Sequence, residues 1–299
     1  MGYDNAAACN RELGAELRKR REAAGVAGAA VADYTGWDRS KISRIESGQI
    51  GVSPVDALYY LGACQVWAPD AKEILDLCET AQRKLGYWLS PKGERLDRMF
   101  STLTFHESTA TSLTLYDPHV VNGLLQTRDY ARALFSRESR RDADDVAHCV
   151  DLRIARQQIL NRPRPAKFTF FVHETALRRE VGGRDVQQEQ LLHVVLLAAL
   201  PHVTLRVIPA STEAPSAGGP FQLFNWSQHR PLIYLDNQPC GFFLEDDELV
   251  TPIRDLIQLI ATAAMDEARS REWVASLANE LDRANEEYGT HGLEEGHRQ

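Results

Sequence analysis

The first 84 residues carry the hydrophobic pattern of short helices separated by turns. Apolar positions recur at helical spacing in about residues 11–24, 28–34, 39–47, 54–63 and 70–84, with no β-rich run among them. Gly25 and Gly48 follow the first and third helices, where a left-handed residue is favoured. Ser53 and Pro54 form a cap followed by proline at the first helical position. This pattern predicts a five-helix domain over residues 10–84.

After residue 93 the pattern changes to strand-like runs alternating with helices. Strand-like runs occur at 111–116, 167–172, 203–208, 220–226, 232–235 and 241–244, and helical patterns at about 94–106, 142–160, 184–200 and 246–285. Residues 85–93 hold two glycines and a proline, so we place a linker there. The chain is therefore predicted to be mainly α, with a second, mixed α+β domain of about five strands over 94–285 and a frayed tail at 286–299.

Composition fits a folded protein of two domains. The chain has 299 residues, of which 43% are hydrophobic and 25% charged, close to the globular average. The longest apolar stretch, residues 194–200, is far short of the roughly 20 residues that cross a bilayer. No signal peptide is visible, and the five cysteines show no C-x-x-C spacing. We expect a cytoplasmic protein with reduced thiols and no contact with membranes.

The charge distribution allows a local contact with DNA. The net charge is −8, which argues against a protein coated in positive charge. Residues 1–50 nevertheless hold eight Lys and Arg against seven Asp and Glu, a net charge of +1. The acidic excess therefore lies in the rest of the chain.

The segment 36–48, GWDRSKISRIESG, predicts a helix with two unlike faces. At ~100° per residue, Arg39, Ser43, Ser40 and Arg44 fall within an arc of about 140°, and Ile42 and Ile45 fall on the other side. Arginine reads guanine with two hydrogen bonds, and serine bonds base edges or phosphate. The polar face therefore suits the major groove of DNA, although a solvated face of an ordinary helix explains the same pattern.

The surrounding pattern resembles the Xre/phage-repressor class of helix-turn-helix proteins over about residues 12–64. A short helix, a tight turn at Gly36 and a second short helix ending I-E-x-G carry the resemblance. It implies that Arg39, Ser40 and Arg44 occupy base-reading positions, with Lys41 and Ser43 beside them.

The same resemblance implies two further roles. Glu46 is expected to form an ion pair with Arg21 of the first helix. The second helix of such proteins commonly begins with a glutamine that holds a phosphate. Gly28 stands there in this chain, so only its backbone N–H is available for that contact.

The second domain resembles a domain of undefined function that follows this type of DNA-binding domain in actinobacterial regulators. Four sequence segments carry this resemblance and follow one another in the same order as in that family. They lie at residues 117–134, 153–165, 174–183 and 218–226. The resemblance implies an antitoxin-like transcriptional regulator, of a kind sometimes encoded beside a small partner protein.

Motifs of enzymes, metal sites and cofactor sites are missing or incomplete. The segments HESTA and HETAL begin like zinc-protease helices, but Ala110 and Leu177 replace the second histidine, so we expect no metal site. No P-loop, G-x-S-x-G or G-x-G-x-x-G motif occurs, and we expect no cofactor and no catalysis. The predicted strands bring together aromatic residues that either line a ligand pocket beside His173, Arg178 or Arg179 or simply form the core. These are Phe168, Phe170, Phe171, Phe221, Phe224 and Trp226.

The sequence thus predicts a transcriptional regulator that reads double-stranded DNA as a homodimer through the major groove, with a second domain for dimerisation and for sensing an effector or partner. The alternatives are an antitoxin-like protein that acts mainly by binding a small partner protein, and a small-molecule sensor. The C-terminal helices carry an apolar stripe that fits a dimer interface and an intramolecular core equally well. It consists of Ile253, Leu256, Ile257, Ile260 and Ala264.

Overall fold

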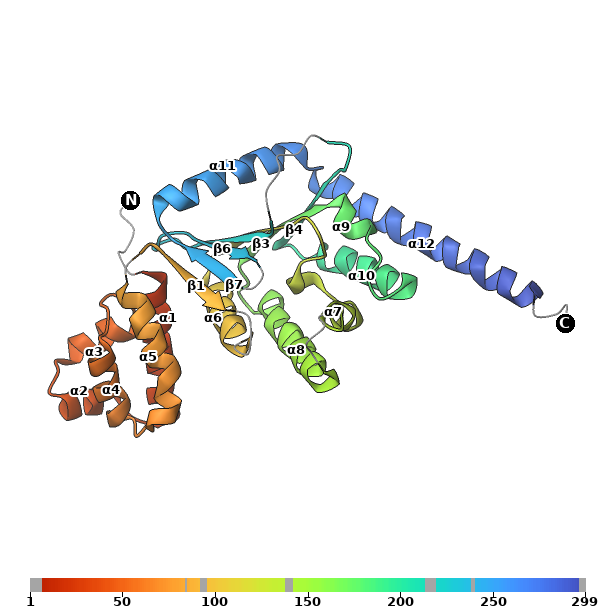
Figure 1. The fold of residues 1–299 in the computed structure, drawn as a ribbon. Helices are drawn as coiled ribbons and strands as arrows, with labels where there is room; N and C mark the ends of the chain where they lie inside the picture. Colours follow the sequence, from red (N-terminus) through yellow and green to blue (C-terminus); the bar gives the residue numbers. More distant parts are fainter. Residues whose placement is uncertain are drawn as a thin grey trace.

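The computed structural model describes residues 7–83, 85–91, 96–137, 142–212, 219–237 and 240–295. Its N-terminal part is a bundle of five helices, as the sequence predicts (Figure 1). They are α1 (Ala8–Ala23), α2 (Gly28–Thr35), α3 (Arg39–Glu46), α4 (Pro54–Ala63) and α5 (Ala68–Gln82). A separate apolar cluster holds them together, with Leu13, Leu17, Ile45 and Leu61 almost fully buried.

The rest of the described chain is an α+β domain built on one seven-stranded sheet. The strands are β1 (Tyr87–Pro91), β2 (Ser112–Asp117), β3 (Lys167–His173), β4 (Val203–Ile208), β5 (Phe221–Asn225), β6 (Leu232–Asp236) and β7 (Cys240–Leu244). Their order is β1-β7-β6-β5-β2-β3-β4, with β2, β3 and β4 parallel and the other pairs antiparallel. The prediction of a mixed α+β domain is confirmed.

Helices cover both faces of this sheet. In Figure 1, α11 (Asp247–Ala263) lies above the sheet, and α6 (Leu96–Thr109), α7 (Arg128–Phe135), α8 (Ala143–Arg156) and α10 (Arg184–Leu197) lie below it. The short helix α9 (Glu174–Arg178) follows β3, and α12 (Glu267–Glu295) packs on α10. Side chains alternate between the two faces along each strand, so the strands contribute to the apolar clusters on both sides of the sheet. Phe168 and Phe170 of β3 point into the core below the sheet, and Phe171 points into the core above it.

The apolar stripe of α11 is used within the chain. Ile257 and Ile260 are buried with Phe171 and Ile233 of the sheet, and Ala264, just after the helix, lies in the same cluster. Ile253 and Leu256 pack against this cluster while remaining partly exposed. Of the two uses that the sequence allows for the stripe, the structure shows the intramolecular core.

The aromatic residues of the strands are core residues as well. All six are buried, in the two clusters on either side of the sheet. Arg178 lies over Trp273 of α12 and bonds Glu174, and His173 caps α9. The rings pack against one another and against the covering helices, as the alternative of core residues predicts.

Strand β1 is an element that the sequence pattern misses, as is the short helix α9. Strand β1 lies within the predicted linker 85–93 and pairs antiparallel with β7, where Trp88 stacks on Phe243 with ring centroids 4.8 Å apart. Residues 84 and 92–95, where the predicted domains end and begin, lie outside the described residues, so the domain limits remain predictions. Helix α12 reaches Glu295 within the predicted tail 286–299, and residues 296–299 also lie outside the described residues.

Helix α1 begins three residues earlier than the sequence predicts, because its first turn packs on the second domain. The backbone N–H of Ala8 donates to Glu245 Oε2 at 2.7 Å, and Ala8 is buried in the core of the α+β domain. The Arg11 guanidinium lies 4.5 Å from the ring centroid of Trp226. Thr102 of α6 donates to Glu12 Oε1 at 2.6 Å, with both side chains buried. One helix thus belongs to both domains.

Candidate nucleic-acid interface

Helices α2 and α3 form a helix-turn-helix. Gly36 ends α2 with a φ of 71°, a left-handed conformation that glycine adopts without strain. Asp38 then caps α3 by accepting a hydrogen bond from the backbone N–H of Ser40 at 2.7 Å. The apolar side chains Ile42 and Ile45 of α3 are buried in the helical bundle. The opposite face of α3 is therefore left to solvent.

This outer face of α3 carries four of the six sequence-predicted DNA contacts. Arg39, Ser40, Ser43 and Arg44 are all exposed. Arg44 lies along the helix, with its Nε 3.4 Å from the carbonyl oxygen of Ser40. We call these four residues the α3 face. It presents two guanidinium groups and two hydroxyls with no carboxylate among them.

Lys41 lies apart from the α3 face. Its ammonium nitrogen is 3.7 Å from the ring centroid of Trp37 and 3.7 Å from Asp56 Oδ2 on α4. A cation held over an indole ring and beside a carboxylate is stabilised where it stands. The structure therefore gives Lys41 a contact within the bundle, which the resemblance did not indicate.

Gly28 opens α2, which has no side-chain cap among the described residues. Its first backbone N–H groups therefore point out of the helix end, where an anion such as a phosphate is favoured. A Cβ at Gly28 would lie 3.7 Å from Ile42 Cγ2, which is ordinary contact.

Arg21 of α1 and Glu46 of α3 are joined by two hydrogen bonds. Arg21 Nε donates to Glu46 Oε1 at 2.7 Å, and Nη2 donates to Oε2 at 2.9 Å. The Tyr60 hydroxyl of α4 donates to the same Oε1 at 2.6 Å. Burial acts to raise the pKa of Glu46, but these hydrogen bonds outweigh burial, so the pKa lies below its ordinary value. Tyr60 is the member of this network that sequence reasoning missed.

Two glycines set how closely α1 approaches the end of α3. A Cβ at Gly14 would lie 2.3 Å from the carbonyl oxygen of Ile45, and one at Gly48 would lie 2.6 Å from Arg11 Cα. Gly48 also has a φ of 75°. The ion pair and these backbone contacts together fix the orientation of α3 on the bundle.

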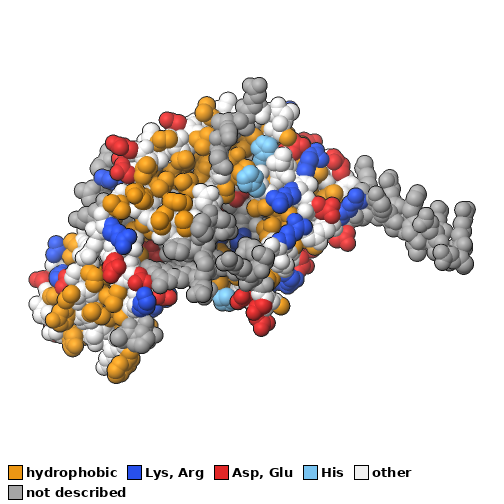
Figure 2. Space-filling model, in the orientation of Figure 1, with side chains coloured by type: hydrophobic (Ala, Val, Ile, Leu, Met, Phe, Trp, Pro, Cys, Tyr) orange, Lys and Arg blue, Asp and Glu red, His pale blue; other side chains and the backbone are white. Residues whose placement is uncertain are grey.

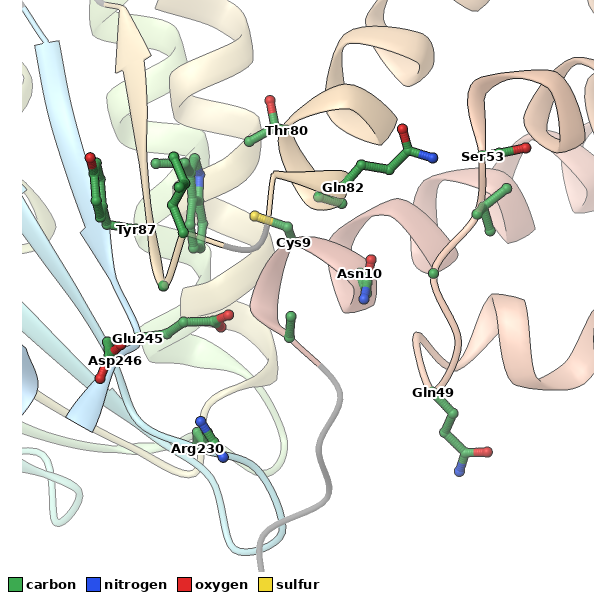
Figure 3. Close-up of a pocket in the computed structure, with 17 residues that line it drawn as sticks. Cys9, Asn10, Gln49, Ser53, Thr80, Gln82, Tyr87, Arg230, Glu245 and Asp246 are labelled. Atoms are coloured by element: carbon green, nitrogen blue, oxygen red, sulfur yellow. The ribbon is translucent and has the colours of Figure 1, made fainter. Parts of the chain in front are cut away.

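A cleft of about 670 Å³ lies where the bundle meets the sheet (Figure 3). Cys9 and Asn10 of α1 line one side, and Tyr87, Glu245 and Asp246 line the other. One oxygen of Glu245 already accepts a hydrogen bond from the backbone N–H of Ala8, which joins the two domains.

Within the described residues, no three His, Cys, Asp or Glu side chains are grouped as metal ligands would be. His106 of the HESTA segment is fully buried among aromatic rings, including Phe243 at 5.7 Å between centroids. None of the described helices combines the length and apolar character that a bilayer span needs.

Two family models match successive parts of the chain. Residues 12–75 match the model described as a helix-turn-helix domain, which includes the α3 face, Arg21 and Glu46. This match supports a DNA-binding transcriptional regulator. None of the curated proteins matches the chain. Residues 100–276, more than half of the chain, match the model described as a domain of unknown function, DUF5753, and the chain therefore belongs to that family.

Proposed function

We propose that this regulator reads the major groove of a specific operator through the α3 face. The observation that carries the proposal is the exposed set of two arginines and two serines on a helix held rigidly by Asp38 and by the Arg21–Glu46 pair. Rigid presentation matters because base readout depends on placing a guanidinium within hydrogen-bond reach of a base edge.

Arg39 and Ser40 lie in the first turn of α3, the part that enters the groove deepest in this docking mode. Arg44 lies one turn further on, where it reaches a base edge or the phosphate backbone. We propose that the N–H at Gly28 holds a phosphate and that Lys41 supports Trp37 beside the groove.

Replacing Arg39 with alanine is expected to cost ~1–3 kcal/mol of binding free energy on the preferred operator and to flatten base preference at one position per half-site. The measurement is selection of bound sequences from a randomised DNA pool, followed by titration of the selected operator with both proteins.

The matched control is Arg18→Ala, which removes an exposed arginine of α1 that pairs with Glu22. If Arg18 contacts phosphate, its loss should weaken binding to all DNA sequences alike. The slope of log affinity against log salt concentration should then fall by roughly 0.9 for the one charge removed. Unchanged affinity and unchanged base preference for Arg39→Ala would show that the α3 face is only solvated.

We also propose that the protein acts as a homodimer. One recognition helix buries too little surface to be specific in a genome, and two helices about 34 Å apart reach successive major grooves. The outer side of α11 supports an interface in the second domain, because Leu249 and Leu259 remain exposed there and hydrophobic side chains gather on this part of the surface (Figure 2). Light scattering at micromolar concentration should give twice the chain mass, and a monomer both with and without operator DNA would contradict the dimer.

A further inference from the structure

A second, smaller pocket opens at one end of the sheet. Strand β2 ends there at Asp117, β5 begins at Phe221 and β6 ends at Asp236, so three strand ends meet beneath α6, η1 (Gly123–Leu125) and α8. The cavity measures about 240 Å³. Its apolar wall comes from α6 and α7, through Phe100 and Phe135. Charged and amide side chains form the rest of the lining.

Two polar atoms in this pocket are buried without a hydrogen-bond partner. They are Gln222 Oε1, on a residue that is only 8% exposed, and Arg153 Nε. Burying an unpaired donor or acceptor is costly, so such groups are uncommon in native structures. Here one orphan is an acceptor and the other a donor, and both belong to residues that line the same cavity.

The surrounding residues hold the Arg153 side chain in place but leave its Nε without a hydrogen-bond acceptor. Its Nη1 donates to Gln126 Oε1 at 2.8 Å, and its guanidinium carbon lies 4.9 Å from the ring centroid of Phe135. Gly123 gives it room, since a Cβ there would lie 2.4 Å from Nη1. Burial, and then the positive charge of Arg156, lower the pKa of Arg153 to about 10, which still leaves it cationic at neutral pH.

Two carboxylates line the same pocket as Arg153 and act on its charge. They are Asp236 and Asp117, and Asp117 accepts one hydrogen bond from Asn122 Nδ2 at 2.6 Å. Burial raises the pKa of Asp117 to about 7, because a carboxylate in this position has lost most of its solvation. The pocket therefore offers a cation and carboxylates in one lining.

We propose that this pocket binds a small α-amino acid or a similar zwitterion. The ligand carboxylate accepts from Arg153 Nε, and the ligand ammonium donates to Asp117 and to Gln222 Oε1. At ~30 Å³ per water molecule the cavity holds about eight waters, which corresponds to a ligand of about eight non-hydrogen atoms. The charge of Arg156, which also lines the pocket, is compensated by Glu107 at 2.8 Å. The site does not depend on DNA binding.

The test is calorimetric titration of the full-length protein, without DNA, with amino acids from alanine to valine in size. L-valine has eight non-hydrogen atoms, and two matched probes remove one charge each: isobutylamine lacks the carboxylate and isovalerate lacks the ammonium. We expect binding of at least one amino acid and at least tenfold weaker binding of both its single-charge analogues. Absence of binding for every amino acid at millimolar concentration, or equal binding of an analogue, overturns the proposal.

Three variants locate the site. Asp117→Asn is expected to weaken binding about tenfold or more, because a hydrogen bond to a charged group is lost. The matched control Asp151→Asn removes a carboxylate from an exposed pair with Arg128 on α8 and should leave binding unchanged. Gln222→Met removes the orphan acceptor, so it should weaken binding while raising the melting temperature of the ligand-free protein. Wild-type affinity in both pocket variants would place the ligand elsewhere.

The pH dependence gives a second readout. An amino acid keeps both charges between pH 5.5 and 8, so only protein groups titrate. Asp117 is faced by Asn122, Asp236, Arg153 and Arg156, and Arg153, with its pKa lowered to about 10, stays cationic over this pH range. Because the ligand prefers ionised Asp117, affinity should fall up to tenfold per unit below pH 7 and level off above it. The Asp117→Asn protein should lose this dependence, and retention of it would contradict the assignment.

Discussion

Replacing Glu107 with glutamine is expected to destabilise the protein by about 3–5 kcal/mol, a large part of the ~5–15 kcal/mol that a folded domain usually has. Arg156 Nε donates to both oxygens of Glu107, at 2.8 and 3.1 Å, and both side chains are almost completely buried. Removing the carboxylate leaves the buried guanidinium charged and without its hydrogen-bonded partner. The measurement is the urea concentration at half-unfolding, compared with wild type.

The control is the exposed pair of Arg128 and Asp151, whose side chains are 50% and 66% exposed. Asp151→Ala should cost under ~1 kcal/mol, since solvent screens an exposed pair. Replacing Glu107 and Arg156 together by methionine should recover most of the loss, because no charge is then left unpaired. A Glu107→Gln protein as stable as wild type would mean that Arg156 finds another partner or reaches water.

Replacing Gly48 with alanine is expected to destabilise the helical bundle by about 2–5 kcal/mol and to abolish operator binding. A left-handed residue with a Cβ costs ~1–2 kcal/mol, and overpacking a filled site costs ~1–3 kcal/mol more. The new Cβ would lie 2.6 Å from Arg11 Cα, and backbone atoms cannot turn away as a side chain can. Thermal unfolding and operator titration measure the two effects.

Gly25 supplies the matched control for this experiment. It also has a positive φ, of 67°, but a Cβ there would meet no atom within 4 Å. Gly25→Ala should therefore lose only the ~1–2 kcal/mol of the backbone conformation and keep operator binding. Equal losses for the two variants would show that the close approach of α1 to α3 contributes nothing.

Local signals in the sequence were sufficient to predict the helices of the N-terminal domain. The period of α3, the Asp38 cap and the Ser53–Pro54 start all depend on residues within one or two helical turns. The six strand-like runs after residue 105 also correspond to observed strands, because alternating or continuous apolar residues are read locally.

Elements that depend on distant partners could not be predicted. Strand β1 exists through its pairing with β7, more than 140 residues away in sequence, and glycine and proline near it gave the signal of a turn. The early start of α1 depends on Glu245. The pocket joins Asp117, Arg153 and Gln222 from three elements, and no spacing in the sequence indicates that they meet.

The contacts of α1 with both domains restrict how the protein would bind the proposed operator. Arg11 and Glu12 are held by Trp226 and Thr102 of the second domain, so the bundle is not carried on a loose tether. In the proposed dimer, the distance and angle between the two recognition helices are then set by the body of the molecule. A flexible linker would accept half-sites at several separations along the duplex. We therefore expect this junction to favour operators with one centre-to-centre spacing, because inserting a few base pairs between the half-sites would turn the second site away from its helix.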